Sequence, residues 1–159
     1  MLSKEKLAAM KYLKKEFDNL QHDPILSLGC TVGLVKNDIF HWKITLIGPV
    51  DTPYAGGLFI LTADFPEKYP EQKPEVKFVN KIYHLNVSPR SGHICINILN
   101  SYKPRTPIVD IISGIFSLFY NQNPESPYDH GMADEYRNRK DEFDKKAKEW
   151  TLKYASMNQ

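Results

Sequence analysis

The stretch CTVGLVKNDIFHWKITLIGPVDTPYAGGLFILTAD, residues 30–64, decides the fold of this chain. It alternates runs rich in β-branched and aromatic residues with two turn-forming segments, Lys36–Asp38 and Gly48–Gly57. Such a succession predicts strands joined by turns. With one later run included, the predicted strands are Cys30–Val35, Ile39–Ile47, Leu58–Asp64 and Val76–Val79. Four consecutive strands of this kind indicate an antiparallel meander.

Three dipeptides that end in proline separate the third and fourth predicted strands: Phe65-Pro66, Tyr69-Pro70 and Lys73-Pro74. Proline has no N–H to donate to a sheet ladder, so these residues cannot lie in a central strand. We therefore expect a stiff turn at one end of the sheet.

Helical periodicity precedes the predicted sheet. Apolar residues recur at steps of three and four between Ser3 and Leu20, which predicts an amphipathic helix with Ser3 as its N-cap. Asp23-Pro24 is expected to stop the helix, because the residue before a proline avoids the helical region. The apolar residues are Leu7, Met10, Leu13, Phe17 and Leu20.

Further helices are predicted after the sheet. Ile108–Tyr120 is apolar around much of its circumference, which predicts a buried central helix, and Ala133–Asn138 and Lys140–Ala155 predict two more. The segment Lys81–Pro107 keeps neither period for long, although it is too apolar to be disordered. Since long irregular segments in a compact domain are usually functional, we expect the site there. The order helix, strands, helices indicates an α+β fold.

The composition of the chain fits one compact domain over residues 1–159, with 42% hydrophobic and 25% charged residues. No run approaches the roughly 18 apolar residues that cross a bilayer, and no signal peptide is evident. We expect a cytoplasmic or nuclear monomer that binds neither membranes nor nucleic acid, because the net charge is only +2.

Two cysteines, Cys30 and Cys95, cannot form a disulfide framework or a four-ligand zinc site by themselves. No CxxC or HxxxH spacing occurs, so no metal site is expected. By spacing alone, Cys95 would be a small buried apolar residue, which is the usual fate of a free cysteine.

Seven motifs, in order along nearly the whole chain, resemble signatures of the ubiquitin-conjugating enzyme family. They are His41-Trp42, Gly48-Pro49 with Thr52-Pro53-Tyr54 and Gly56-Gly57, Phe65-Pro66 to Tyr69-Pro70, Ile82-Tyr83-His84, Gly92-His93-Ile94-Cys95, Asn123-Pro124, and Glu149-Trp150-Thr151. The resemblance implies an N-terminal helix, a four-stranded antiparallel sheet, a central helix and C-terminal helices. It also implies that Cys95 accepts ubiquitin or a ubiquitin-like modifier from an activating enzyme as a thioester. Transfer to a substrate lysine or a ligase follows, and ATP is used by the activating enzyme, so this chain needs no cofactor.

Amine attack on a thioester develops negative charge on the carbonyl oxygen, where a positioned amide donor can contribute about 3 kcal/mol. The resemblance assigns this donor to Asn86. An equally plain role for Asn86 is to brace its loop by hydrogen bonds to the backbone. His84 is expected to shape the same loop rather than to move protons.

The chain departs from the family pattern at several site positions. Leu85 replaces the proline of a His-Pro-Asn motif, and the stretch from Asn86 to Cys95 is one residue longer than usual. Asn97 and Ser126 stand where family members often carry acids that serve the incoming lysine. Glu125 could replace them in part.

Two docking surfaces are implied by the resemblance. The activating enzyme is expected to bind the basic helix face, although a solvated face is the plainer interpretation of a lysine run. Its residues are Lys4, Lys11, Lys14 and Lys15. Ligases are expected to contact Glu71, Pro104 and Arg105, at positions whose residues differ from the common ones, so no ligase class follows.

Two alternatives remain at this point. The altered Leu85, Asn97 and Ser126 are compatible with a non-enzymatic variant that only binds ubiquitin, although such variants characteristically lack the cysteine. Asn97 also occurs in some members dedicated to a ubiquitin-like modifier.

Overall fold

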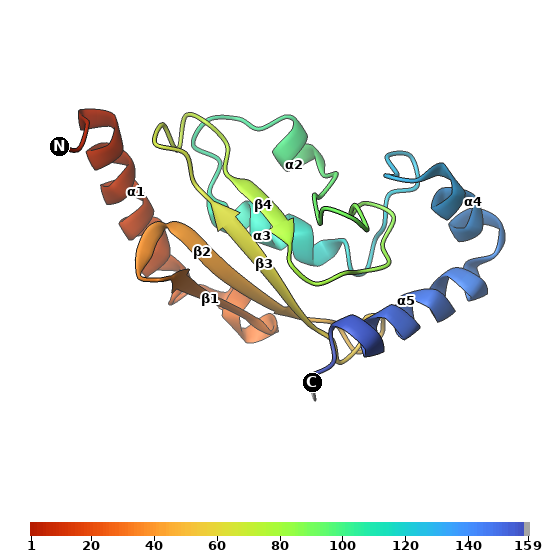
Figure 1. Cartoon of the computed structure of the whole chain (residues 1–159). Helices are drawn as coiled ribbons and strands as arrows, with labels where there is room; N and C mark the ends of the chain where they lie inside the picture. The colour runs from red at the N-terminus through yellow and green to blue at the C-terminus, as the bar shows by residue number, and fades with distance from the viewer. Residues whose placement is uncertain (158–159) are drawn as a thin grey trace.

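The computed structural model describes residues 1–157 and arranges helices around a single four-stranded sheet (Figure 1). The predicted order of helix, four strands and further helices is confirmed. The elements are α1 (Lys4–Leu20), the 3-10 helix η1 (Pro24–Leu28), β1 (Cys30–Val35), β2 (Asp38–Ile47), β3 (Leu58–Asp64), β4 (Glu75–Phe78), α2 (Asn97–Asn100), α3 (Ile108–Ser117), α4 (His130–Asn138) and α5 (Lys140–Tyr154). The last two residues of the predicted domain 1–159 lie outside the described part.

The sheet is an antiparallel meander in the order β1-β2-β3-β4, as predicted. Trp42 of β2 pairs with Leu34 of β1 on one side and with Ala63 of β3 on the other. The proline-rich residues between β3 and β4 form turns rather than a strand, which confirms the predicted turn. This connection lies next to α1, because the Tyr69 hydroxyl hydrogen-bonds to the Glu16 carboxylate.

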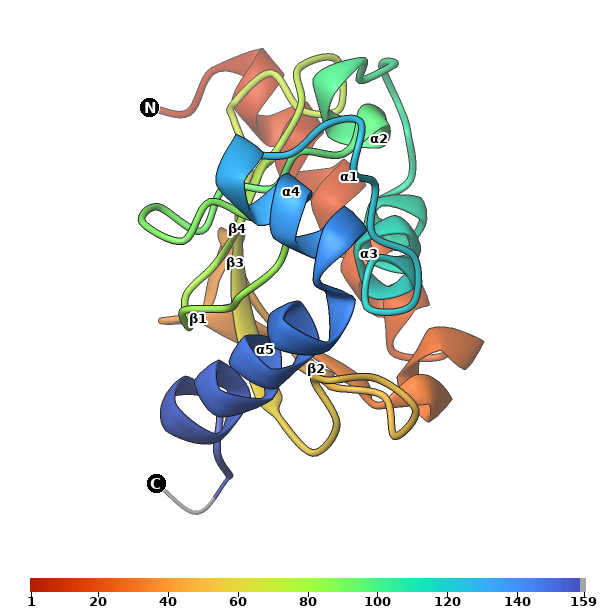
Figure 2. The same ribbon diagram turned by 90° about the vertical axis from the view of Figure 1, so that its right-hand side faces the viewer.

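Helices α4 and α5 follow one another along the side of the molecule opposite α1 (Figures 1 and 2). They bury a small apolar cluster that contains Leu85, Met132, Ala133 and Phe143. Leu85 is fully buried there, so the residue that departs from the family motif anchors the predicted site loop to the C-terminal helices.

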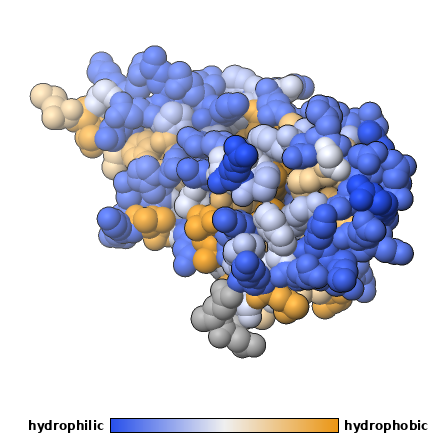
Figure 3. Space-filling model, turned by 45° about the vertical axis from the view of Figure 1, so that its right-hand side comes forward, coloured by the Kyte–Doolittle hydropathy of each residue, from blue (hydrophilic) through white to orange (hydrophobic). Residues whose placement is uncertain are grey.

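The face drawn in Figure 3 is mostly hydrophilic, with small apolar patches between charged side chains. Among residues 1–157, no helix combines the length and the apolar character needed to span a bilayer. Within the same residues, no three His, Cys, Asp or Glu side chains gather in a way that could hold a metal ion.

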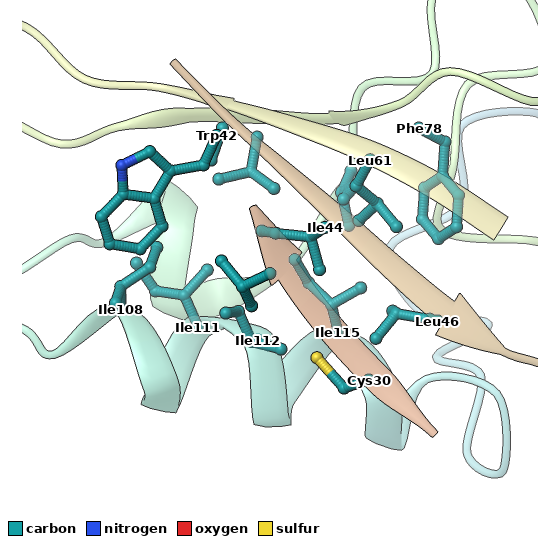
Figure 4. Packing of buried hydrophobic residues seen from close by; sticks show 14 of the residues in the cluster. Cys30, Trp42, Ile44, Leu46, Leu61, Phe78, Ile108, Ile111, Ile112 and Ile115 are labelled. Carbon is teal, nitrogen blue, oxygen red and sulfur yellow. The ribbon is translucent and has the colours of Figure 1, made fainter. Parts of the chain in front are cut away.

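The main core lies between the inner face of the sheet and α3 (Figure 4). Alternate residues of β2, namely Trp42, Ile44 and Leu46, are buried, as the two-residue period of a strand requires. They point towards a row of buried isoleucines on α3, Ile108, Ile111, Ile112 and Ile115. The predicted central buried helix is confirmed, although it ends at Ser117 instead of Tyr120, which is exposed.

Helix α1 begins as predicted, with the Ser3 hydroxyl oxygen accepting a hydrogen bond from the Lys6 N–H at 3.0 Å. Its Phe17 ring meets Trp42 edge-on at 5.3 Å between centroids. Leu7, which was assigned to the apolar face, is 43% exposed, and Ala9 is buried instead. The step of three from Leu7 to Met10 places Leu7 beyond the edge of the buried stripe.

Candidate active site around Cys95

Cys95 lies in the irregular segment between β4 and α2, where the site was expected. Its backbone N–H donates to the Asn86 carbonyl at 2.7 Å, and the neighbouring Val87 and Ile94 form an isolated antiparallel bridge. The Cys95 side chain is half-buried, whereas Cys30 is buried in the main core. The segment therefore presents one of the two thiols to solvent.

A tight turn precedes Cys95 in the loop that was expected to be one residue longer than usual. The Ser88 side-chain oxygen accepts hydrogen bonds from the Arg90 and Ser91 N–H groups, at 3.4 and 3.2 Å. Gly92 follows with φ +77°, and a Cβ there would lie 2.0 Å from the Phe78 carbonyl oxygen. Only glycine fits, so the turn fastens the loop to the end of β4.

His84 is fully buried and hydrogen-bonded through both ring nitrogens. Its Nδ1 accepts from the Asn86 backbone N–H at 3.0 Å, so its Nε2 carries the proton and donates to the Leu118 carbonyl at 2.8 Å. Burial lowers the pKa of His84 to about 4. A neutral imidazole with both nitrogens occupied holds the loop in shape, in agreement with the role expected for it.

The Asn86 side chain is completely buried and faces the segment after α3 rather than solvent. Its Oδ1 accepts from the Asn123 N–H at 2.8 Å, and its Nδ2 donates to the carbonyls of Asn123 and Ser126 at 2.8 and 3.0 Å. Both amide hydrogens are therefore engaged. This arrangement favours the bracing role over the donor role for Asn86.

An open groove is bordered by two neighbours of Cys95, Ile94 and Asn100, and by Glu75, His93 and Tyr128 among others. His93 uses its ring nitrogens on Ser91 Oγ at 2.8 Å and on Glu75 Oε1 at 3.3 Å. It is turned towards β4, so it is not placed as a base for Cys95. The Asn100 side chain, in contrast, brings its Nδ2 to 3.5 Å from the Cys95 Sγ.

The chain matches the family model described as ubiquitin-conjugating enzyme over residues 12–151. It belongs to the ubiquitin-conjugating enzyme family. Members of this family are transferases that work with ubiquitin or a related modifier, an activating enzyme and ligases. The family, the fold and the enzyme class predicted from the motifs are confirmed.

Two solved structures are similar to this ubiquitin-conjugating enzyme along almost the whole chain. The E2 domain of a Toxoplasma gondii ubiquitin conjugating enzyme is 33% identical, with a TM-score of 0.81, over 92% of this chain and 98% of that chain. A chain described as a ubiquitin conjugating enzyme of Plasmodium yoelii is 31% identical, with a TM-score of 0.83, over 98% of both chains.

The side chains predicted to serve the incoming lysine offer little free negative charge in this ubiquitin-conjugating enzyme. Glu125 is exposed, and its carboxylate accepts a hydrogen bond from Arg137 at 3.0 Å. Asn97 is exposed at the start of α2. Ser126 is half-buried, and its carbonyl accepts a hydrogen bond from the Asn86 side chain. The one carboxylate expected to help, that of Glu125, is thus paired with Arg137 at the surface.

The predicted ligase contacts lie close together in two loops beside α1. Arg105 donates to the Glu71 carboxylate at 3.1 Å, and its backbone N–H donates to the Pro70 carbonyl at 2.9 Å. Pro104 precedes Arg105 in the same exposed loop. Tyr12 of α1 lines the groove beside Glu71 and Arg105. All four lysines predicted to bind the activating enzyme, Lys4, Lys11, Lys14 and Lys15, are exposed on α1.

Sequence reasoning missed two features of the site. The short helix α2 lies within the segment predicted to be irregular, because four residues are too few to show a helical period. The contact of Asn100 with Cys95 was missed for the same reason, since only the end of α2 brings the two side chains together.

Proposed function

We propose that Cys95 carries ubiquitin or a ubiquitin-like modifier as a thioester. The observation that supports this most directly is the position of its thiol, which is half-buried beside an open groove, whereas the other thiol of the chain is buried. A carrier sulfur must reach the activating enzyme, the modifier and the acceptor in turn, and only a thiol near the surface allows this.

The proposed reaction has two balanced steps. In the first, the Cys95 thiolate attacks the thioester carbonyl that joins the modifier's C-terminus to the activating enzyme, whose own thiolate leaves. In the second, a neutral lysine amine attacks the carbonyl now attached to Cys95. The carbon–sulfur bond breaks, its electron pair returns to the Cys95 Sγ, and the surplus amine proton passes to water. The products are an isopeptide bond and the Cys95 thiolate, which takes up a proton from water to give the free thiol.

The second step receives little help from carboxylates around Cys95. Holding a lysine amine neutral at pH 7 costs roughly 4 to 5 kcal/mol from its usual pKa of about 10.4. Glu125 is engaged by Arg137, and Asn97 and Ser126 carry no charge. We therefore propose that efficient discharge depends on a ligase or on the substrate's own surroundings, with docking at Glu71, Pro104 and Arg105.

A charging assay tests this function. The purified protein is incubated with an activating enzyme, ATP and a panel of modifiers that contains ubiquitin and ubiquitin-like proteins. We expect one of them to give a band shift that dithiothreitol removes, that Cys95→Ala abolishes and that Cys30→Ala leaves in place. Binding of a modifier without a thioester would reject the carrier function in favour of the non-enzymatic alternative.

The same panel identifies the modifier, because competing modifiers charge Cys95 in proportion to their preference. A cytoplasmic or nuclear location, a monomeric state and the absence of a cofactor stay predictions.

A further inference from the structure

Asn100 is the last residue of α2, and its side-chain amide lies on the sulfur of Cys95, with 3.5 Å between Nδ2 and Sγ. We propose that Asn100 is a catalytic residue whose amide stabilises negative charge on the Cys95 Sγ. The proposal rests on the function proposed for Cys95. It names the group that acts on the sulfur, which neither the family nor the spacing of residues assigns.

Negative charge reaches this sulfur twice in the proposed reaction. It is present when the thiol ionises to attack, and it returns when the carbon–sulfur bond breaks during discharge. A hydrogen bond to a charged acceptor is stronger than one to a neutral acceptor, so an amide aimed at Sγ favours the thiolate over the thiol and the thioester. The Asn100 amide should therefore increase the amount of thiolate available for attack and speed the release of Sγ during discharge.

Asn86 is poorly suited to this work. Turning its amide towards Cys95 would break two part-buried hydrogen bonds and leave the carbonyls of Asn123 and Ser126 without their donor. Each unsatisfied buried group costs about 1 to 3 kcal/mol. That cost is similar to the roughly 3 kcal/mol that one transition-state donor contributes. If the Asn86 amide has to leave these two carbonyls in order to act on the reacting group, the transition state gains little net stabilisation.

Asn100 carries no such cost. Its side chain is exposed, and the Cys95 sulfur is the one hydrogen-bond partner that the part of the chain from 1 to 157 gives it. The backbone beneath it is held firmly, because its N–H donates to the Ile96 carbonyl at 2.9 Å and the preceding Leu99 is buried. The helix therefore fixes the Asn100 backbone beside Cys95, while the exposed side chain can adjust to follow the sulfur.

Alkylation of Cys95 by iodoacetamide tests the contact without an activating enzyme or a modifier. Peptide mass spectrometry reads the rate at Cys95 separately from that at Cys30. At pH 7 we expect Asn100→Leu to slow alkylation of Cys95 by about 2- to 3-fold, because the hydrogen bond favours the thiolate but also lowers its nucleophilicity.

Three further variants separate a specific contact from a general disturbance. Asn100→Asp should slow alkylation more than Asn100→Leu, because a carboxylate repels the thiolate, and Asn100→Gln should recover part of the rate. Asn121→Leu, the same change at an exposed asparagine away from Cys95, should leave the rate unchanged. Equal rates at pH 7 for Asn100→Leu and the unmodified protein would overturn the proposal.

Single-turnover discharge of the loaded enzyme to free lysine provides the second readout. Asn100→Leu should slow it by a similar factor while the thermal unfolding temperature stays the same. Slower alkylation together with no charging by any modifier would reject the carrier function and keep the contact. If Asn100→Leu shows normal charging, normal discharge and unchanged alkylation, the carrier function stands and the role of Asn100 is rejected.

Discussion

The Glu16 carboxylate of α1 accepts a hydrogen bond from the backbone N–H of Ile108, 2.8 Å away at the first residue of α3. The N-cap position of α3 is Pro107, which has no side-chain acceptor, so an acceptor from another helix takes this place. The other Glu16 oxygen binds the Tyr69 hydroxyl. One side chain thus joins the helix predicted to bind the activating enzyme, the proline-rich turn and the central helix.

Replacement of Glu16 by alanine should lower the free energy of unfolding by about 2 to 4 kcal/mol at pH 7, because the Ile108 N–H and the Tyr69 hydroxyl both lose their acceptor. Urea denaturation measures this. Glu5→Ala, on the exposed side of the same helix, should change stability by less than about 0.5 kcal/mol. A Glu16→Ala protein as stable as the Glu5→Ala protein would contradict the prediction.

The stability difference between Glu16→Gln and the unmodified protein should depend on pH. Burial raises the pKa of Glu16 above its usual value. A raised folded-state pKa gives a stability contribution that is present below the unfolded-state pKa and is lost as the pH rises through the folded-state pKa. The glutamine variant, which cannot ionise, should therefore gain stability relative to the unmodified protein between pH 4 and pH 7. Urea midpoints at several pH values check the sign, and a constant difference would refute it.

His84 should make the protein less stable in mild acid. Burial lowers its folded-state pKa to about 4, below the usual value of about 6.5, so its contribution is present above pH 6.5 and is lost as the pH falls towards 4. Between pH 7.5 and pH 5 the loss should be about 2 kcal/mol. His84→Gln lacks the titrating group, so its unfolding free energy should fall by about that much less over the same range.

Asn86→Ala should loosen the segment from Asn123 to Ser126, because the three hydrogen bonds that the buried Asn86 side chain makes to this backbone are lost. We expect the free energy of unfolding to fall by about 2 to 4 kcal/mol. Amide hydrogen exchange in this segment should be faster, while Asn121→Ala leaves it as it was. Unchanged stability and exchange, together with lysine discharge slowed by roughly 10²-fold, would instead support the donor role for Asn86.

Reversal of two charges on α1, Lys11→Glu with Lys14→Glu, should slow charging of Cys95 by the activating enzyme. The effect should be large at low salt and shrink as salt screens the exposed charges. Lys145→Glu with Lys148→Glu provides a matched control, since both lysines are exposed on α5 at the opposite end of the molecule (Figure 1). Equal charging rates for the two double variants at low salt would remove α1 as the docking surface.

The strands could be predicted from the sequence because each is a short run of β-branched and aromatic residues bounded by turn-forming residues. Two predicted strands, Cys30–Val35 and Leu58–Asp64, have the observed limits, and the other two shift by one residue. Helix α4 begins at His130, three residues before the predicted start, because the Asp129 side chain caps it by accepting from the Met132 N–H. The 3-10 helix η1 is too short to show a period.

The contacts at the site could be predicted only in part. The motif around Cys95 identifies the sulfur, but nothing in the sequence pairs Glu16 with Ile108, or Asn86 with Ser126, because these pairs form only when distant elements pack. Asn100 is five residues from Cys95, a spacing that brings side chains together neither in one helix nor in one strand.

Burial of Cys30 leaves Cys95 as the thiol that a reactive dye can label in the native protein. Burial raises the pKa of the Cys30 thiol to about 11, so at neutral pH it is neither ionised nor accessible. A maleimide dye added to the native protein should therefore attach at position 95 alone. Fluorescence from that single label would report directly on whatever approaches the groove.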